Sequence, residues 1–248
     1  MKRVFFAALS LVFVFAFASL TAADETTENL DELWKTRTGN TAPMIEALGV
    51  AEAAYANGAD FEIAWRAARA CFWICDRTEA RATDAKYGTL GYEWAQKAID
   101  LKPGRVEGHY YYTLCIGEYG KGISIPKAMA KGVGPKFEKA GKKALAISGK
   151  FDHGGIYRAW GRYYHKLPWP LYSFKKSEKY LLDGLKLFPK GPRSAFYLAE
   201  LYVKEKKYDK AREVLNNLQA MEGYPNLQWE TKWYKKQAST LMKKIEGK

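Results

Sequence analysis

Residues 198–215, LAELYVKEKKYDKAREVL, decide the fold of this protein. In the first half, Leu198, Ala199 and Tyr202 follow one another at helical spacing, and Ala211 and Leu215 do so in the second half. The polar run from Lys206 to Asp209 separates the halves and predicts a turn. Small residues on facing helices allow a close approach, so the stretch predicts a helical hairpin.

The order of large and small residues resembles the tetratricopeptide repeat, a helix pair of about 34 residues. The preceding hairpin fits the same pattern, but the insertion Leu167-Pro168-Trp169-Pro170 lengthens its turn. Its matching residues are Tyr157, Trp160, Gly161, Tyr164, Ser177, Leu181, Gly184 and Pro189.

Two looser pairs come earlier in the chain. One joins Trp65, Ala68 and Phe72 to a second helix with Gly91, Ala95, Ala98 and Pro103, across a predicted loop around Asp76 to Lys86. The other joins Tyr111, Leu114 and Cys115 to Ala140, Ala144 and Ile147, across Gly117 to Pro135. We therefore predict an all-α, right-handed α-solenoid of about four degenerate hairpins. A generic helical bundle is the alternative.

The predicted domain boundaries follow from these repeats. Residues 61–225 form the repeats, 24–60 the N-terminal capping helices and 226–248 the C-terminal capping helix, all within one domain of residues 24–248.

Residues 1–23 have the order of a secretory signal. Lys2 and Arg3 precede an uncharged apolar run from Val4 to Leu20, and small residues lead to a cleavage site after Ala23. We expect export, most simply to the periplasm. The alternative is an uncleaved segment that anchors the protein in the inner membrane.

The chain is basic, with a formal net charge of +13. Such a charge suits anionic lipid, cell-wall polymers or an acidic partner, but the lysines are scattered and a solvated surface explains most of them. Export argues against nucleic acid as a partner. We expect contact with membrane only through the N-terminal segment.

The three cysteines are too few for a disulfide-built scaffold. Cys71 and Cys75 share a helix face, and one of them could pair with Cys115 in an oxidising compartment. The three are equally well explained as small buried apolar residues.

The sequence holds no recognisable catalytic motif. His109, His153 and His165 lack partners at metal-ligand spacing, and no nucleophile elbow, phosphate loop or zinc-protease motif is present. Asp152 is expected to cap the helix that follows it. We predict neither enzymatic activity nor a cofactor or metal.

Residues 152–170, DHGGIYRAWGRYYHKLPWP, precede a second helix that ends in Leu187-Phe188-Pro189. This arrangement is similar to exported bacterial tetratricopeptide proteins, and among them it resembles the T component associated with TRAP transporters. The resemblance covers residues 85–205. It implies a periplasmic protein that assists a substrate-binding protein in capturing hydrophobic or organic-acid ligands. The lipid-anchoring cysteine that is frequent in that group is absent here.

The first helices of such repeats line a binding surface through their places 2, 5, 9 and 12. Aromatic rings there supply apolar contact area and arginines bind carboxylates, so we expect a protein partner or a small organic or hydrophobic anion. The alternative function is a protein–protein scaffold in cell-envelope assembly. The predicted contact residues are Arg66, Trp73, Tyr112, Tyr119, Arg158, Arg162, His165 and Phe196.

Overall fold

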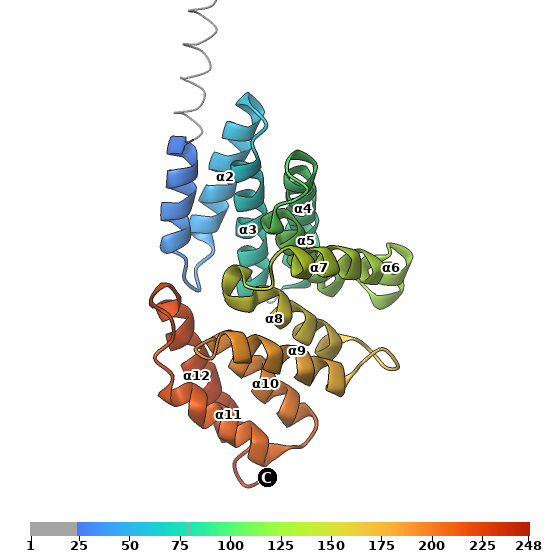
Figure 1. Ribbon diagram of the computed structural model, residues 1–248, viewed down its shortest axis with the longest axis vertical. Helices are drawn as coiled ribbons and strands as arrows, with labels where there is room; N and C mark the ends of the chain where they lie inside the picture. Colours follow the sequence, from blue (N-terminus) through green and yellow to red (C-terminus); the bar gives the residue numbers. More distant parts are fainter. Residues whose placement is uncertain (1–23, 79) are drawn as a thin grey trace, which may run out of the picture. The chain divides into compact units, whose positions relative to one another are not determined.

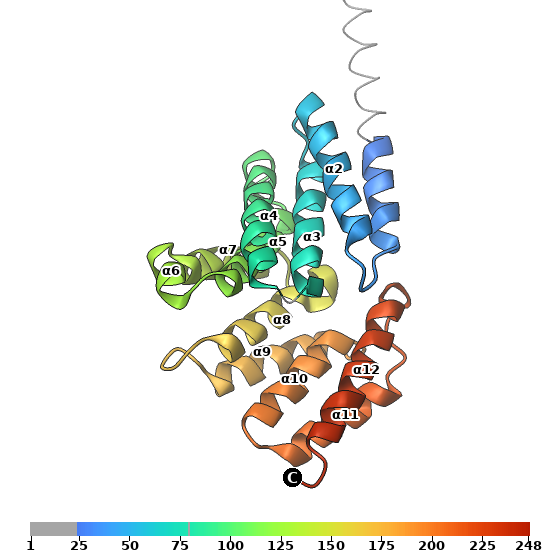
Figure 2. The ribbon, with the colours of Figure 1, turned by 180° about the vertical axis from the view of Figure 1, so that it is seen from behind.

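The computed structural model describes residues 24–78 and 80–248, and in these ranges every regular element is a helix (Figures 1 and 2). The predicted signal segment lies outside the described residues. A helix over residues 24–35 is followed by α2 (Ala42–Asn57), α3 (Phe61–Thr78), α4 (Arg81–Leu101), α5 (Val106–Gly122), α6 (Ile125–Ala130), α7 (Val133–Ser148), α8 (Phe151–Lys166), α9 (Phe174–Leu187), α10 (Pro192–Lys204), α11 (Tyr208–Ala220), η1 (Pro225–Leu227) and α12 (Gln228–Lys244).

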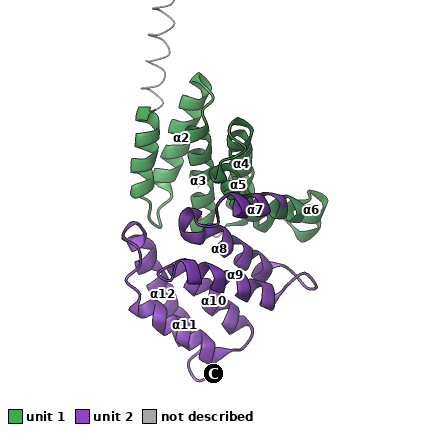
Figure 3. Ribbon diagram, viewed as in Figure 1, with its two compact units in different colours: residues 1–138 green, residues 139–248 purple. Residues whose placement is uncertain are grey.

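The helices form two compact units (Figure 3). Unit 1 ends at Glu138 and unit 2 runs from Lys139 to Lys248, so the division falls inside α7. Successive helices pair as hairpins within each unit: α2 packs on α3 and α3 on α4, α4 packs on α5, α8 packs on α9 and α10 on α11. This confirms the predicted all-α fold of successive helical hairpins.

Local sequence signals explain several helix boundaries. The Asp60 carboxylate accepts the backbone N–H groups of Glu62 and Ile63 at 2.6 and 3.1 Å, which satisfies two otherwise unpaired donors at the start of α3. Pro43 lies in the first turn of α2, where a missing N–H does no harm. The α9 helix begins after Ser173, whose hydroxyl accepts the N–H of Lys176 at 3.3 Å.

Unit 2 confirms the close approach that small residues were expected to allow. An added Cβ at Gly161 of α8 would lie 2.5 Å from Cγ of Leu181 of α9. The buried Ser177 hydroxyl donates to the carbonyl of Gly161 at 2.8 Å, across the same contact. Only a glycine therefore fits at the crossing of these two helices.

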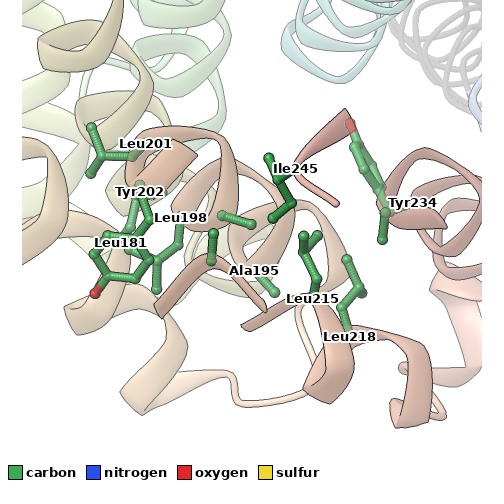
Figure 4. Close-up of a cluster of buried hydrophobic side chains, with 12 residues drawn as sticks. Leu181, Ala195, Leu198, Leu201, Tyr202, Leu215, Leu218, Tyr234 and Ile245 are labelled. Atoms are coloured by element: carbon green, nitrogen blue, oxygen red, sulfur yellow. The ribbon is translucent and has the colours of Figure 1, made fainter. Parts of the chain in front are cut away.

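The core of unit 2 joins the helices on which the fold prediction was based (Figure 4). Leu181 of α9, Leu198 and Leu201 of α10, and Leu215 and Leu218 of α11 are all at most 2% exposed. The residues that define the hairpin of residues 198–215 are thus its core. Because they are apolar and buried, they supply most of the free energy that holds these helices together.

Unit 1 is packed in the same way but through α4 and α5. An added Cβ at Gly88 of α4 would lie 2.5 Å from the backbone nitrogen of Tyr119 of α5. At Gly91, a Cβ would lie 2.5 Å from the Cys115 sulfur and 2.9 Å from Cβ of Cys71. The two helix backbones are therefore nearly in contact.

The predicted loop around Asp76 to Lys86 was wrong. The α3 helix continues to Thr78 and α4 begins at Arg81, so only residues 79 and 80 separate them. The polar and charged composition of this stretch suggested a loop, whereas most of it belongs to the ends of two long helices, with Asp84 buried. The predicted insertion at Leu167 to Pro170 is a non-helical connection. Among the described helices, none is long and apolar enough to cross a bilayer.

Candidate functional site

The predicted contact residues divide evenly between the units. Arg158, Arg162 and His165 of α8 and Phe196 of α10 belong to unit 2, whereas the other four lie on α3 and α5 of unit 1.

Arg162 and Glu200 link the first helices of two successive hairpins in unit 2. The Arg162 guanidinium donates to Oε2 of Glu200 at 2.5 Å and lies 4.2 Å above the ring of Tyr197. The two charged side chains keep 31% and 27% of their surface exposed. Burial lowers the pKa of Arg162, but Tyr197 and Glu200 outweigh burial and raise it. The pair is thus a fixed cation and anion at a surface.

Phe196 continues this surface towards α12. Its ring lies 5.4 Å from the ring of Tyr234, and Arg193 binds Glu230 at 3.0 Å between the same two helices. The first helices of the two hairpins, α8 and α10, therefore pack side by side, and the C-terminal helix α12 packs on α10. We call Arg162, Phe196, Tyr197 and Glu200 the first-helix surface.

Arg158 is held by an unusual turn at the start of α8. Asp152, His153 and Gly154 have positive φ values of 48°, 50° and 70°. Such a conformation is strained for Asp and His. The Asp152 carboxylate accepts the Arg158 guanidinium at 2.7 Å. The three left-handed residues form a kink inside α8, and the capping role expected of Asp152 stays a prediction.

His165 lies in the interior of unit 2 rather than on its surface. Its side chain is 4% exposed and its Nδ1 has no hydrogen-bond partner. Burial, helped by Arg162, Lys166 and Lys204, lowers the pKa of His165 to about 3. The ring is therefore neutral near physiological pH and not accessible to a ligand on the surface.

In unit 1, Arg66 is engaged by residues of the protein itself. The Asp31 carboxylate accepts Arg66 at 2.7 and 3.0 Å and Arg69 at 2.7 Å, which ties the helix of residues 24–35 to α3. Glu62 accepts Arg66 at 2.8 Å as well. These contacts explain Arg66 as a structural residue.

Trp73 belongs to the same junction. It is 1% exposed, its ring packs edge-on at 5.4 Å from Trp34, and its Nε1 donates to the Thr38 carbonyl at 3.1 Å. The aromatic character of Trp73 pointed to a binding surface. Trp34 lies far from Trp73 in the sequence and no local pattern pairs the two rings, so this junction was not predicted.

Tyr112 and Tyr119 form a partly exposed aromatic cluster on α5. Tyr92 of α4 lies between them, with ring centroids at 5.9 and 5.7 Å respectively. Burial raises the pKa of Tyr112 and of Tyr92. The cluster supplies apolar surface with hydroxyl groups at its edge.

A buried group of acids around Lys121 was not predicted. Lys121 binds Glu118 on the same helix and lies 3.7 Å from Asp84 of α4, which is 3% exposed. Burial raises the pKa of Glu118 to about 7, although Lys121 acts in the opposite direction; Asp76 and Asp84 add to the increase. The i, i+3 spacing of Glu118 and Lys121 was visible in the sequence, but the approach of Asp84 depends on the α4–α5 contact.

The raised pKa of Glu118 makes the stability of unit 1 depend on pH. Because its folded pKa exceeds its unfolded value of 4.5, the stabilisation is complete below pH 4.5 and is lost as pH rises through about 7. Glu118→Gln should remove this decline. The free energy of unfolding of the variant, relative to that of the wild type, should therefore increase by about 1–3 kcal/mol between about pH 5 and about pH 8. Urea unfolding at both pH values measures these free energies. Glu46→Gln, at an exposed position on α2, serves as the control. If the unfolding free energy of Glu118→Gln changed with pH as much as that of the wild type, Glu118 would not be the group responsible.

The three cysteines are buried free thiols. Burial raises the pKa of Cys71, Cys75 and Cys115, so the thiols are unreactive in the folded state. In the described part of the chain, no group of three or more His, Cys, Asp or Glu residues is arranged to hold a metal ion.

The fold is shared with a solved tetratricopeptide protein. The crystal structure of a thermophilic TPR protein from Thermus thermophilus superposes with a TM-score of 0.63, covering 88% of this chain and 98% of that one. The sequences are 16% identical, so the likeness concerns the fold alone.

The sequence also matches a curated relative and a family. Regulator of microtubule dynamics protein 1 of Bos taurus is 28% identical over 132 residues, which are 52% of this chain and 40% of the bovine protein. The match thus spans less than half of that relative. The family described as Regulator of microtubule dynamics protein 1-3 matches residues 26–166, more than half of the chain. The protein therefore belongs to this family, RMD1-3.

Proposed function

We propose that this protein is a non-catalytic interaction module that binds an acidic segment of a protein partner on the first-helix surface of unit 2. The observation that carries the proposal is the Arg162–Glu200 pair. It bridges two successive first helices, it stays partly exposed, and the ring of Tyr197 lies against the Arg162 guanidinium.

Each member of this surface suits a different part of a peptide. A guanidinium presents a planar set of donors that matches a carboxylate in two parallel hydrogen bonds. The Tyr197 ring lies against Arg162 and restricts its orientation, which reduces the entropy lost on binding. Phe196 adds apolar contact area, and the net charge of +13 favours an acidic partner.

Two substitutions should change binding in opposite directions. Arg162→Ala removes the cation, and we expect about 10- to 100-fold weaker binding because hydrogen bonds to charged groups contribute about 1.5–3 kcal/mol. Glu200→Gln removes the carboxylate that competes for Arg162, so affinity should rise. Arg212→Ala on α11, which bonds Asp209 outside this surface, is the matched control. Isothermal titration with a glutamate-rich peptide measures the affinity of all three variants, and equal affinities across the series would rule out this surface.

The bovine relative supplies the first partner to test. Its name assigns it to the regulation of microtubule dynamics, and the family match over residues 26–166 favours the same role as a second candidate here. Microtubules can be used in a co-sedimentation assay with the same variants.

Export and a role beside a transporter form a separate proposal, which is an alternative to the microtubule role. The basic, apolar and small residues of positions 2–23 support secretion to the periplasm, with retention by an uncleaved segment as the alternative. The motif of residues 152–170 supports assistance to a TRAP-type transporter. Native mass spectrometry distinguishes a bound organic anion from a protein partner, and scaffolding in the cell envelope would give the latter.

A further inference from the structure

The connection between α8 and α9 holds large apolar side chains in water. Trp169 is 89% exposed and Leu171 is 59% exposed, and Pro168 and Pro170 beside them are exposed too. Of the large apolar side chains that the structure describes as exposed, Trp169 has the highest exposed fraction. Figure 1 shows this connection extending beyond the ends of its two helices.

This connection is anchored rather than loose. The N–H groups of Leu171 and Tyr172 both donate to the Pro168 carbonyl, at 2.8 and 3.0 Å, and Ser173 N–H donates to the Tyr164 carbonyl at 3.2 Å. The turn between α10 and α11, by contrast, joins its helices without such an insertion. The extra residues are therefore not needed to connect the helices, and they present Trp169 in a defined position.

Contacts with the neighbouring turn place lysines beside this apolar tip. The Tyr172 hydroxyl donates to Glu205 at 2.5 Å. Lys204 lies 3.8 Å above the Tyr172 ring and donates to the His165 carbonyl at 2.9 Å. Lys207 lies 5.0 Å above the Phe174 ring. The connection and the α10–α11 turn thus form one continuous surface of unit 2.

We call this surface the loop face, and its outward members are Trp169, Leu171, Lys175, Lys176, Lys206 and Lys207. Its four lysines outnumber the two carboxylates near it, Glu205, which accepts the Tyr172 hydroxyl, and Asp209, which is paired with Arg212. The loop face therefore combines a protruding apolar tip with an excess of positive charge.

We propose that the loop face docks on an anionic membrane surface, with Trp169 and Leu171 entering the interfacial region. Tryptophan is favoured at membrane interfaces, and lysines next to it are attracted to acidic lipid headgroups. A flat lipid surface needs only a protruding tip. A peptide-binding groove would need protein groups on either side of Trp169, and an exposed fraction of 89% shows that few protein atoms surround this side chain.

The test follows the environment of Trp169 itself, because the apolar segment of residues 4–20 can bind lipid on its own. The full chain is mixed with vesicles that contain brominated lipids, which quench tryptophans at the bilayer. The signal of interest is the difference in quenching between the wild type and Trp169→Phe, which retains an apolar tip. We expect this difference in vesicles of phosphatidylcholine with phosphatidylserine, and little of it in pure phosphatidylcholine.

Charge reversal provides the second arm. Lys206→Glu with Lys207→Glu should weaken the docking measured by this difference about tenfold or more, since each basic residue near an anionic surface contributes to binding. Lys186→Glu with Lys190→Glu makes the same charge change at the opposite end of α9. This control should leave the quenching difference between Trp169 and its Phe substitution unchanged. Equal quenching of the wild type and Trp169→Phe, an equal difference in pure phosphatidylcholine, or no effect of the Lys206 and Lys207 reversals would each overturn the proposal. Circular dichroism checks that each variant is folded, as exposed positions lead us to expect.

Discussion

Gly88→Ala is expected to destabilise unit 1, although the same change stabilises most helices. The added Cβ would lie 2.5 Å from the backbone nitrogen and 2.7 Å from the Cα of Tyr119. Backbone atoms cannot rotate away, so α4 and α5 must separate. Overpacking costs about 1–3 kcal/mol, and a clash with backbone belongs at the upper end, above the ~1 kcal/mol by which alanine favours a helix over glycine.

Gly49→Ala on α2 is the matched control, because a Cβ there meets nothing within 4 Å. It should stabilise the protein by about 0.5–1 kcal/mol. We therefore expect chemical denaturation of the two variants to give opposite signs for one chemical change. A stable Gly88→Ala variant would mean that the close approach of α4 and α5 is not required.

Asp31→Ala should detach the helix of residues 24–35 from α3. The carboxylate binds both Arg66 and Arg69, and Arg69 is only 7% exposed, so its removal leaves a buried guanidinium without its ion pair. Breaking a fully buried pair costs about 3–5 kcal/mol, and because the Asp31 side chain is 37% exposed we expect about 2 kcal/mol. Hydrogen exchange should show lost protection in residues 24–35.

The pH dependence of this junction gives an independent check. Burial raises the pKa of Asp31, but hydrogen bonds and charge from Arg66 and Arg69 outweigh it and hold the pKa below its usual 3.8. Its stabilisation is therefore present above pH 3.8 and is lost as pH falls through the lower folded pKa. Glu32→Ala, whose pair with Lys35 is exposed, should leave protection intact. If hydrogen-exchange protection of residues 24–35 were the same in Asp31→Ala as in the wild type, Asp31 would not be what holds this helix on α3.

The hairpins of unit 2 could be predicted because their pattern is local. Gly161 and Leu181 fall at fixed places in one repeat, and the structure brings these two residues into contact. The connection between α3 and α4 could not be predicted, since its charged residues suit the exposed end of a helix as well as a loop.

The candidate site was predictable only in part. Helical spacing placed Arg162 and Phe196 on first helices, and they lie on α8 and α10. It could not show that Arg66 and Trp73 face the helix of residues 24–35, because Asp31 and Trp34 are distant in sequence. Nor could it show that His165 is buried, since that depends on how α10 packs on α8.

Photo-cross-linking tests most directly whether the first-helix surface binds a protein. A photoreactive phenylalanine analogue at Phe196 would report contact there, and the same group at the exposed Leu187 of α9 would report non-specific contact. We predict a cross-linked protein partner from position 196 that is lost when Arg162→Ala is added, and none from position 187. Cross-links of equal yield from both positions, or none from position 196 while the partner remains bound, would contradict the account.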